Sequence, residues 1–318
     1  MKKLLAIICA VLLLVSLSAC STETDDGKYV IGICQLAKHD ALDAATKGFQ
    51  DALIDELGAE NVVFDLKIAS GDSNTCNNII LNFVSSEVDL IMANATPALQ
   101  AAATATEDIP ILGTSVTEYG VALGISSFSG IVGGNISGTS DLAPLDQQAA
   151  MVKEWFPDAK NVGLLYCSAE ANSKYQVDTV QIELEKLGFT CTQYSFSATS
   201  DLEAITRKAA AESDVIYIPT DNTVAEATGI IDGICRPAGI PVIAGEQAIC
   251  AGCGVATLSI DYYDLGYTTG KMAAQILKGE AKISEMPIAY APQFTKLYNV
   301  EICNELNIPV PDGYSPIE

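Results

Sequence analysis

Short apolar runs alternate along this chain with segments whose apolar residues recur at helical spacing. The clearest helical pattern ends at Gly58 and consists of Leu42, Ala45, Phe49, Leu53 and Leu57. Strands are expected at 31–33, 62–68, 90–93 and 110–112, with a helix before each of the last two. Alternation of strands and helices predicts a parallel sheet with right-handed crossovers.

The second half of the chain repeats the pattern of the first. The segments at 31–33, 89–92 and 109–111 return as 162–164, 214–217 and 240–242. We expect helices in this half at 175–187 and 202–211, and strands at 191–196 and 215–218. A repeat of this length indicates two copies of one domain rather than a solenoid. The predicted fold class is α/β, with two similar Rossmann-like lobes that have parallel sheets and are joined by a hinge.

The segments outside the two copies predict how the lobes are joined. A stretch rich in Gly, Ser and Thr at 130–142 precedes a helix at 145–156 and links the halves. After a helix at 264–277, an extended segment and a short helix are surplus to the second copy, and we expect them to return to the first. The predicted first lobe is therefore 29–140 with the return of 288–318, and the second is 141–287. Two or three crossings of this kind make a hinge about which lobes rotate.

Polar residues follow the matching strands of both copies. Ligands of open α/β sheets bind outside the carboxyl ends of the strands, so two facing lobes place these residues around one cleft. The candidate ligand-binding residues are Gln35, His39, Thr96, Thr114 and Ser115 in the first lobe, and Glu170, Asn172, Asp221, Asn222, Glu246 and Asp261 after it.

Several of these residues also have a purely structural interpretation. Glu170, Asn172 and Asp221 precede expected helices and suit N-caps, and Asp261 suits an N-cap in the hinge. Tyr262 and the tyrosine after it are typical of core or hinge aromatics. We predict Asp221 as the counter-ion of a ligand ammonium group, with Thr96 and Ser115 binding the ligand carboxylate from the opposite lobe.

The N-terminus predicts export and lipid attachment. Two lysines precede an apolar run that is too short to span a membrane, and Leu-Ser-Ala-Cys at 17–20 resembles the bacterial lipobox. We therefore expect a lipoprotein signal peptide at 1–19, lipidation at Cys20 and a polar tether at 20–28. The protein would be extracytoplasmic and anchored to the cell membrane by lipid. A plain secretory signal is the alternative.

Charge, cysteine content and the motifs present limit the classes of function that the chain can have. The net charge is −23, which excludes a nucleic-acid partner and favours cationic or zwitterionic ligands over anionic ones. Cys250 and Cys253 are the only close pair among the eight cysteines that follow Cys20, and His39 is the single histidine. These residues make neither a metal site nor a cofactor site, although a local disulfide is possible. No nucleotide-binding or nucleophile motif appears, so an enzyme is the less favoured alternative.

Several sequence blocks, in order from about residue 29 to 312, resemble the TrpX-like ABC transporter substrate-binding proteins of the type I periplasmic binding fold. The blocks are His39-Asp40-Ala41-Leu42-Asp43, Ala95-Thr96-Pro97-Ala98, Gly138-Thr139-Ser140-Asp141-Leu142, Ser168-Ala169-Glu170-Ala171-Asn172-Ser173, Pro219-Thr220-Asp221-Asn222-Thr223 and Asp261-Tyr262-Tyr263-Asp264-Leu265-Gly266. Asp40 stands where that family commonly has Pro, and Cys167 where it often has Asn.

The resemblance implies that the protein binds a small polar solute, and it favours an amino acid, especially an aromatic one. We expect the protein to be a monomer. It also implies a partnership with an ABC permease and its cytoplasmic ATPase. A receptor for a sugar or another neutral solute, acting in uptake or signalling, is the alternative.

Overall fold

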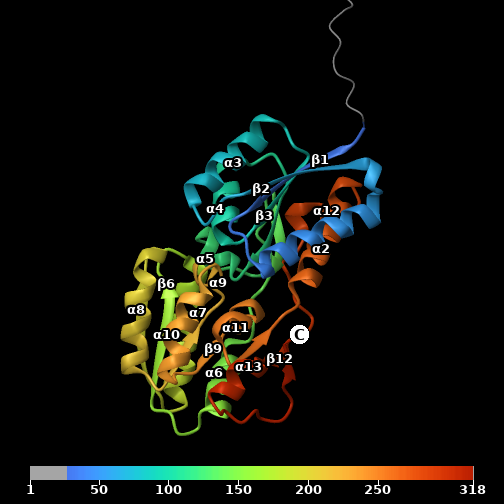
Figure 1. Cartoon of the computed structure of the whole chain (residues 1–318). Coiled ribbons are helices and arrows are strands. Elements are labelled where there is room, and N and C mark those ends of the chain that lie inside the picture. The colour runs from blue at the N-terminus through green and yellow to red at the C-terminus, as the bar shows by residue number, and fades with distance from the viewer. Residues whose placement is uncertain (1–26, 318) are drawn as a thin grey trace, which may run out of the picture.

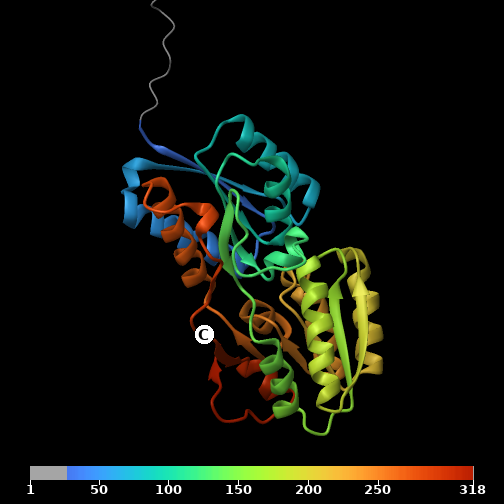
Figure 2. The same cartoon turned by 180° about the vertical axis from the view of Figure 1, so that it is seen from behind.

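The computed structural model describes residues 27–317. The predicted signal peptide, Cys20 and most of the tether lie outside the described residues. Two α/β lobes follow one another along the long axis of the molecule, as Figures 1 and 2 show from opposite sides. Within the described residues, no helix has both the length and the hydrophobicity that a membrane crossing requires.

The first lobe contains a six-stranded sheet with the order β11-β5-β4-β3-β1-β2. Its strands are β1 (Tyr29–Gln35), β2 (Val62–Ile68), β3 (Leu90–Asn94), β4 (Ile111–Val116), β5 (Ile136–Ser140) and β11 (Ala289–Tyr290). All of them are parallel. The helices are α2 (Asp40–Leu57), α3 (Ser73–Ser85), α4 (Thr96–Ala105), α5 (Tyr119–Leu123) and α12 (Tyr262–Leu277), and short 3-10 turns occupy Ala59–Asn61 and Ile283–Glu285.

The second lobe contains a seven-stranded sheet with the order β13-β12-β10-β9-β8-β6-β7. Its strands are β6 (Asn161–Cys167), β7 (Thr190–Phe196), β8 (Val215–Ile218), β9 (Val242–Ala244), β10 (Ala256–Ser259), β12 (Thr295–Tyr298) and β13 (Ser315–Pro316). Only β12 runs antiparallel to its neighbour β10. The helices are α6 (Leu145–Trp155), α7 (Ala171–Lys186), α8 (Thr199–Glu212), α9 (Asn222–Ala225), α10 (Thr228–Ala238), α11 (Gln247–Cys253) and α13 (Val300–Glu305).

The structure confirms the predicted duplication. In each lobe the first strand lies between the second and the third, and the fourth and fifth follow in order. Equivalent aspartates even make equivalent hydrogen bonds. The Asp89 carboxylate accepts from the backbone N–H of Val30, and the Asp214 carboxylate accepts from those of Lys160 and Asn161. Each aspartate therefore ties the start of the third strand to the start of the first.

The predicted lobe boundaries were wrong beyond residue 260. Helix α12 lies beside α2 in the first lobe, where its orange ribbon is seen next to the blue one in Figure 1. Strand β11 joins the first sheet as expected, but β12, α13 and β13 belong to the second lobe. The chain thus crosses between the lobes three times, after Ser140, after Ser259 and after Tyr290. The sequence pattern did not predict this arrangement, because the hydrophobic periodicity of an edge strand does not indicate which of the two sheets the strand joins.

Strand β5 lies inside the segment that was predicted as a link. Its sequence, Ile-Ser-Gly-Thr-Ser, has little hydrophobic character, yet all five residues are buried. The hydroxyl of Thr139 pairs with those of Thr114 and Thr269, and Ser137 donates to the Met286 carbonyl. Buried hydroxyls are tolerated when they are hydrogen-bonded, which explains a strand that hydrophobicity did not indicate.

The described cysteines are mostly buried free thiols. All eight described cysteines are unpaired, and only Cys191 is partly exposed. Cys250 and Cys253 are buried on α11 and form no disulfide.

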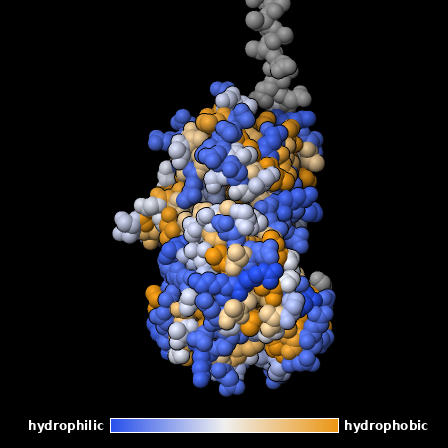
Figure 3. Space-filling model, turned by 60° about the vertical axis from the view of Figure 1, so that its left-hand side comes forward, coloured by the Kyte–Doolittle hydropathy of each residue, from blue (hydrophilic) through white to orange (hydrophobic). Residues whose placement is uncertain are grey.

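The outer surface is mixed in hydropathy. On the face shown in Figure 3, hydrophobic residues occur in small groups among hydrophilic ones over both lobes.

Helices α2 and α12 approach so closely that glycine is required between them. A Cβ atom on Gly266 would lie 1.9 Å from the carbonyl oxygen of Ala45, and one on Gly48 would lie 2.1 Å from that of Tyr263. Gly270 is similarly close to the Phe49 carbonyl. These contacts fix α12, and with it the second crossing of the chain, to the first lobe.

We predict that Gly266→Ala lowers the free energy of unfolding by about 1 to 3 kcal/mol, because the added methyl group forces the two helices apart. Denaturant titration of the purified protein measures this change. Gly233→Ala in α10 is the matched control, since a Cβ atom there meets nothing within 4 Å. We expect that control to be neutral or to stabilise by up to about 1 kcal/mol. Equal destabilisation by both substitutions would contradict the close-packing explanation.

Candidate ligand-binding site

A small enclosed cavity lies between the lobes, where the carboxyl ends of both sets of strands face each other. It encloses about 20 Å³. The first lobe contributes His39, Leu42, Ser115, Asp141 and Tyr262, among others, and the second contributes Asn172, Thr220, Asp221, Asn222, Glu246 and Ile249. Segments that follow six strands therefore meet at one place, as the strand-end rule predicts.

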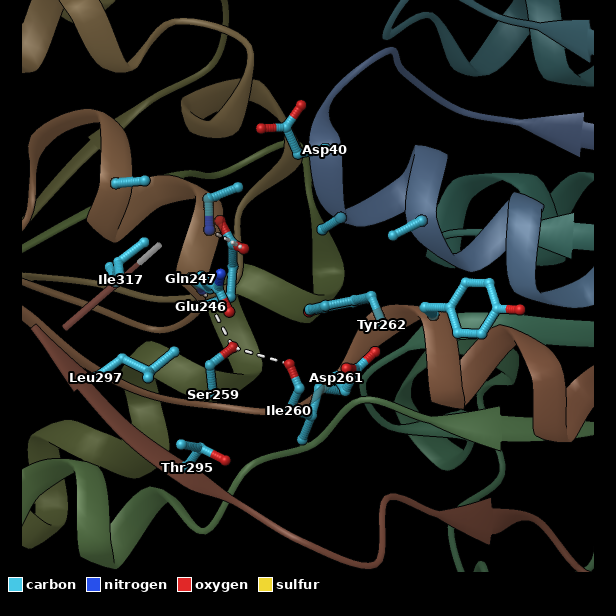
Figure 4. A pocket seen from close by; sticks show the side chains of 15 residues that line it. Asp40, Glu246, Gln247, Ser259, Ile260, Asp261, Tyr262, Thr295, Leu297 and Ile317 are labelled. Carbon is cyan, nitrogen blue, oxygen red and sulfur yellow. Dashed lines mark hydrogen bonds between the residues drawn. The ribbon is translucent and has the colours of Figure 1, made fainter. Parts of the chain in front are cut away.

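A second, larger pocket of about 430 Å³ opens beside the first. Figure 4 shows Glu246, Gln247 and Ser259 on one side of it, with Asp40 and Tyr262 on the other. Ala41, Glu246 and Tyr262 line both spaces, so these residues separate the inner cavity from the outer pocket. The outer walls include Ala44, Ile260, Leu297 and Ile317, which give them apolar surface.

Buried polar atoms without a partner gather around the inner cavity. Nine buried side-chain atoms lack a hydrogen-bond partner within residues 27–317. Four of them belong to residues that line the inner cavity: His39 Nδ1, Ser115 Oγ, Asp141 Oδ1 and Asn172 Oδ1. Two more, Asn94 Oδ1 and Thr96 Oγ1, lie at or just after the end of β3. An unsatisfied buried polar group costs about 1 to 3 kcal/mol. Such a concentration is typical of a site that satisfies its hydrogen bonds with a ligand.

Three buried carboxylates give the cavity its charge. Asp141, Asp221 and Glu246 line it, and neither lysine nor arginine does so. Burial and, to a smaller extent, the neighbouring Glu170 charge raise the pKa of Asp221 to about 7. Burial also raises the pKa of Glu246 to about 7, against the lowering effect of the Ala248 and Ile249 N–H groups. The cavity therefore favours a ligand that carries a positive charge.

Asp221 caps a helix and also lines the cavity. Its Oδ1 accepts from the Val224 N–H at 2.9 Å and caps α9, and its Oδ2 accepts from the Cys167 N–H at 2.7 Å. The side chain is also buried against the cavity. Glu246 is similar, since its two oxygens accept from Ala248 and Ile249 at the start of α11.

Two hydrogen bonds join the lobes beside the cavity. The ring Nε2 of His39, after β1, lies 3.2 Å from Oδ1 of Asn222 on the second lobe. Beside it, the Lys38 N–H donates to the Glu226 carboxylate at 3.4 Å. Burial lowers the pKa of His39, against smaller effects of Asn222 and nearby carboxylates. A neutral ring with Nε2 protonated suits the contact, because the amide oxygen then accepts.

Ser115 and Thr96 stand where the first lobe faces the cleft. Ser115 has a φ of 53° and Ala95, just before Thr96, has a φ of 90°. Such left-handed conformations are costly for residues other than glycine and are common where backbone is shaped around a ligand. Helix α4 begins at Thr96 without a side-chain cap, which leaves its first N–H groups suited to a carboxylate.

Five predicted residues do not line the inner cavity, and Thr96 is one of them, although its hydroxyl is buried and has no partner among the described residues. The amide of Gln35 is fully used within its lobe, by Ala37, Asp43 and Thr46. The hydroxyl of Thr114 pairs with that of Thr139 inside the first lobe. Both side chains were expected in the cleft because they follow strands, but each points to the side where its own helices pack.

The other two are Glu170 and Asp261. Glu170 accepts from the N–H groups and side chains of Asn222 and Thr223, so it holds the loop before α9 in place. Asp261 is exposed, caps α12 by accepting from the Asp264 N–H, and lines only the outer pocket. The capping interpretation is therefore seen for Asp261, whereas the Glu170 side chain makes no capping hydrogen bond to α7.

Asp141 and Tyr262 line the inner cavity but were not among the predicted ligand-binding residues. Tyr262 donates to Asp141 Oδ2 at 3.0 Å, and both side chains are buried. The available signal for Asp141 was an acidic residue directly after a strand. That signal was hidden because β5 was interpreted as part of a link.

Two similar lobes with a polar, acid-lined cavity between their strand ends define a two-lobed solute-binding protein. The chain matches the family of ABC transporter substrate binding proteins over residues 30–315, and it belongs to that family. Members of this family bind solutes and are not enzymes, which agrees with the absence of a catalytic motif in the sequence.

Individual relatives share most of their length with this chain. A tyrosine-binding protein of Clostridioides difficile strain R20291 is 34% identical, covering 96% of this chain and 93% of the relative. An ABC domain from Streptococcus pneumoniae in complex with L-Trp is 31% identical, with a TM-score of 0.86 over 91% of this chain and all of that one. A ligand-free, open substrate-binding protein with adhesive properties from Clostridium difficile is 36% identical over 91% and 99% of the chains, with a TM-score of 0.70.

We predict that the unliganded protein becomes less stable as the pH rises from about 4.5 to 8. An acid whose pKa is raised on folding contributes stability that is present below its unfolded pKa and is lost as the pH passes its folded value. Asp221 and Glu246 lose this contribution to the free energy of unfolding as the pH rises to about 7. In Asp221→Asn, the loss of unfolding free energy over this range should be smaller by about 1 to 3 kcal/mol.

Denaturant titrations at several pH values measure the slope. Asp72→Asn is the control, because Asp72 is an exposed N-cap of α3 whose pKa is lowered by the Thr75 N–H. It titrates below the tested range and should leave the slope unchanged. An identical slope in wild type and Asp221→Asn would contradict a raised pKa at Asp221.

Proposed function

We propose that this protein is the extracytoplasmic, lipid-anchored receptor of an ABC importer and that it binds an aromatic amino acid between its lobes. The observation that carries this proposal is the meeting of acidic and unpartnered polar groups from both lobes at one cavity. A zwitterion suits that combination, because its ammonium group pairs with the acids and its carboxylate accepts from hydroxyl and N–H donors.

The ends of the ligand have separate partners in this proposal. The ammonium group faces the acidic wall formed by Asp141, Asp221 and Glu246. The carboxylate binds the Ser115 hydroxyl and the start of α4 at Thr96, both of which have unpartnered buried oxygens. Asp221 and Glu246 belong to the second lobe, whereas Ser115 and Thr96 belong to the first, so the full set of partners is assembled only when the two lobes close.

The aromatic ring needs more space than the inner cavity offers. The charged end of an amino acid fits the inner cavity only if the cleft widens, and the ring then extends toward the outer pocket of about 430 Å³. Its apolar walls include Ile260 and Leu297. The relatives support this ligand class, since one is described as tyrosine-binding and another is a complex with L-Trp.

The comparisons also support closure. The chain superimposes better on the L-Trp complex than on the open, ligand-free protein, although the open protein is the more similar in sequence. A difference in lobe angle lowers a TM-score without any change within the lobes. The His39 to Asn222 contact across the cleft is the kind of interaction that a closed arrangement permits.

We predict that the protein binds L-tryptophan or L-tyrosine and discriminates strongly against analogues that lack the amine. Affinity for 3-indolepropionate should be lower than for L-tryptophan by about 100-fold, because the buried acids are left unpaired. Isothermal titration calorimetry of the purified protein measures both constants, with D-glucose as a ligand that has neither charge. Tight binding of glucose and none of amino acids would favour the alternative of a sugar receptor.

Membrane attachment through Cys20 has its own test. We predict that Cys20→Ala abolishes lipid attachment, because no thiol remains at the lipobox position. Cell fractionation should then find the protein unprocessed or in the soluble fraction, whereas the wild type remains with the membrane. Cys34→Ala, a buried cysteine of β1, is the control that should stay with the membrane. A processed Cys20→Ala protein that keeps full membrane association would contradict the anchor.

A further inference from the structure

The three carboxylates of the inner cavity differ in how well the protein itself satisfies them. Both oxygens of Asp221 accept from backbone N–H groups, of Val224 and Cys167. Both oxygens of Glu246 likewise accept from backbone N–H groups at the start of α11. These two acids are held by the fold whether or not a ligand is bound.

Asp141 is different. Its Oδ2 accepts from the Tyr262 hydroxyl at 3.0 Å, while its Oδ1 is buried and has no hydrogen-bond partner among the described residues. Asp141 lines the inner cavity. Burial raises the pKa of Asp141, although the Thr117 and Tyr262 hydroxyls lower it in part. A carboxylate in this position lacks one strong donor, and the cavity is the place from which a donor can come.

We propose that Asp141, held in position by Tyr262, is the carboxylate that binds the ammonium group of the ligand directly. This inference rests on the proposed amino-acid function and names the residue that recognises the amine. It replaces the sequence-based choice of Asp221, whose hydrogen bonds to the backbone give it a mainly structural role.

Asp141 and Tyr262, which form the proposed amine-binding pair, also lie in the segments that connect the two lobes. Asp141 is the first residue after β5, where the chain makes its first crossing between lobes. Tyr262 begins α12, directly after the second crossing. The hydrogen bond between them therefore joins two hinge segments, and α12 is fixed to the first lobe by its glycine contacts with α2. A ligand bound at Asp141 touches the point about which the lobes turn.

Tyr262 serves as a positioning residue in this arrangement. Its ring separates the inner cavity from the outer pocket, and its hydroxyl is used by Asp141. Without the hydroxyl, Asp141 keeps its charge but loses the donor that sets its orientation. Tyr262→Phe therefore tests orientation separately from charge.

The test measures L-tryptophan affinity by calorimetry, and melting temperature without ligand, in four variants of the full chain purified in mild detergent. Asp141→Asn should lower affinity by about 100-fold or more, because the ammonium loses its charged partner. Tyr262→Phe should lower it by about tenfold. Asp221→Asn should lower it by less than about tenfold, and the exposed Asp72→Asn should not change it.

Melting temperatures distinguish binding from structural roles. Asn in place of Asp141 removes a buried, partly unsatisfied charge, so the unliganded variant should melt at the same temperature as the wild type or higher. Asn in place of Asp221 can accept only one of the two backbone hydrogen bonds through its single side-chain oxygen, so that variant should melt lower.

The outcomes separate this inference from the proposed function. If the wild type binds L-tryptophan and Asp141→Asn binds it within threefold as tightly, Asp141 is not the amine partner, and the proposed function is unaffected. A larger loss in Asp221→Asn than in Asp141→Asn would likewise overturn the inference alone. If the wild type binds neither aromatic amino acid nor any other amine-bearing solute, the proposed function fails and the inference fails with it.

Discussion

A carboxylate that moves from water into a protein interior loses its hydration, and the loss must be offset by donors or by a cation. The space between the lobes contains three such groups and no lysine or arginine among its described walls. Two of them, Asp221 and Glu246, are satisfied by backbone N–H groups at the starts of helices. Asp141 is satisfied only on one side. Its Oδ1 has no partner among the described residues and Asp141 lines the cavity, so a bound ligand can supply the missing donor.

The duplicated fold places the incompletely hydrogen-bonded carboxylate between the lobes, where a ligand can reach it. Parallel strands end at the same edge of a sheet, and the two edges face each other across the hinge. Short polar side chains from the two lobes therefore meet in space, although they come from distant parts of the chain. The groups that stabilise each lobe, such as Gln35, Thr114 and Glu170, are hydrogen-bonded inside it. The unpartnered groups lie toward the opposite lobe, so a solute bound there joins the lobes.

Three crossings, rather than a single linker, constrain how the lobes move. Helix α12 returns to the first lobe and packs on α2 through glycines at positions where a methyl group would collide with backbone. The last strands then return to the second lobe. Relative rotation is confined to a few residues at the crossings. Asp141 and Tyr262 lie at two of them and also line the cavity, which makes ligand contact and hinge geometry parts of one structural unit.

The sequence by itself determined the two-lobe design, the alternation of strands and helices and the edge at which the site lies, because hydrophobic periodicity and the long repeat can be recognised along the chain. It also identified His39, Ser115, Asn172, Asp221, Asn222 and Glu246, all of which line the cavity. Strand β5 was missed because its buried hydroxyls satisfy one another only across sheet and helix, which no local pattern reveals. Packing against α2 decided that α12 belongs to the first lobe, and pairing with β10 decided that β12 belongs to the second. The importance of Asp141 likewise depended on the tertiary structure, since whether a buried carboxylate is satisfied is a property of its neighbours in space and not of its position in the chain.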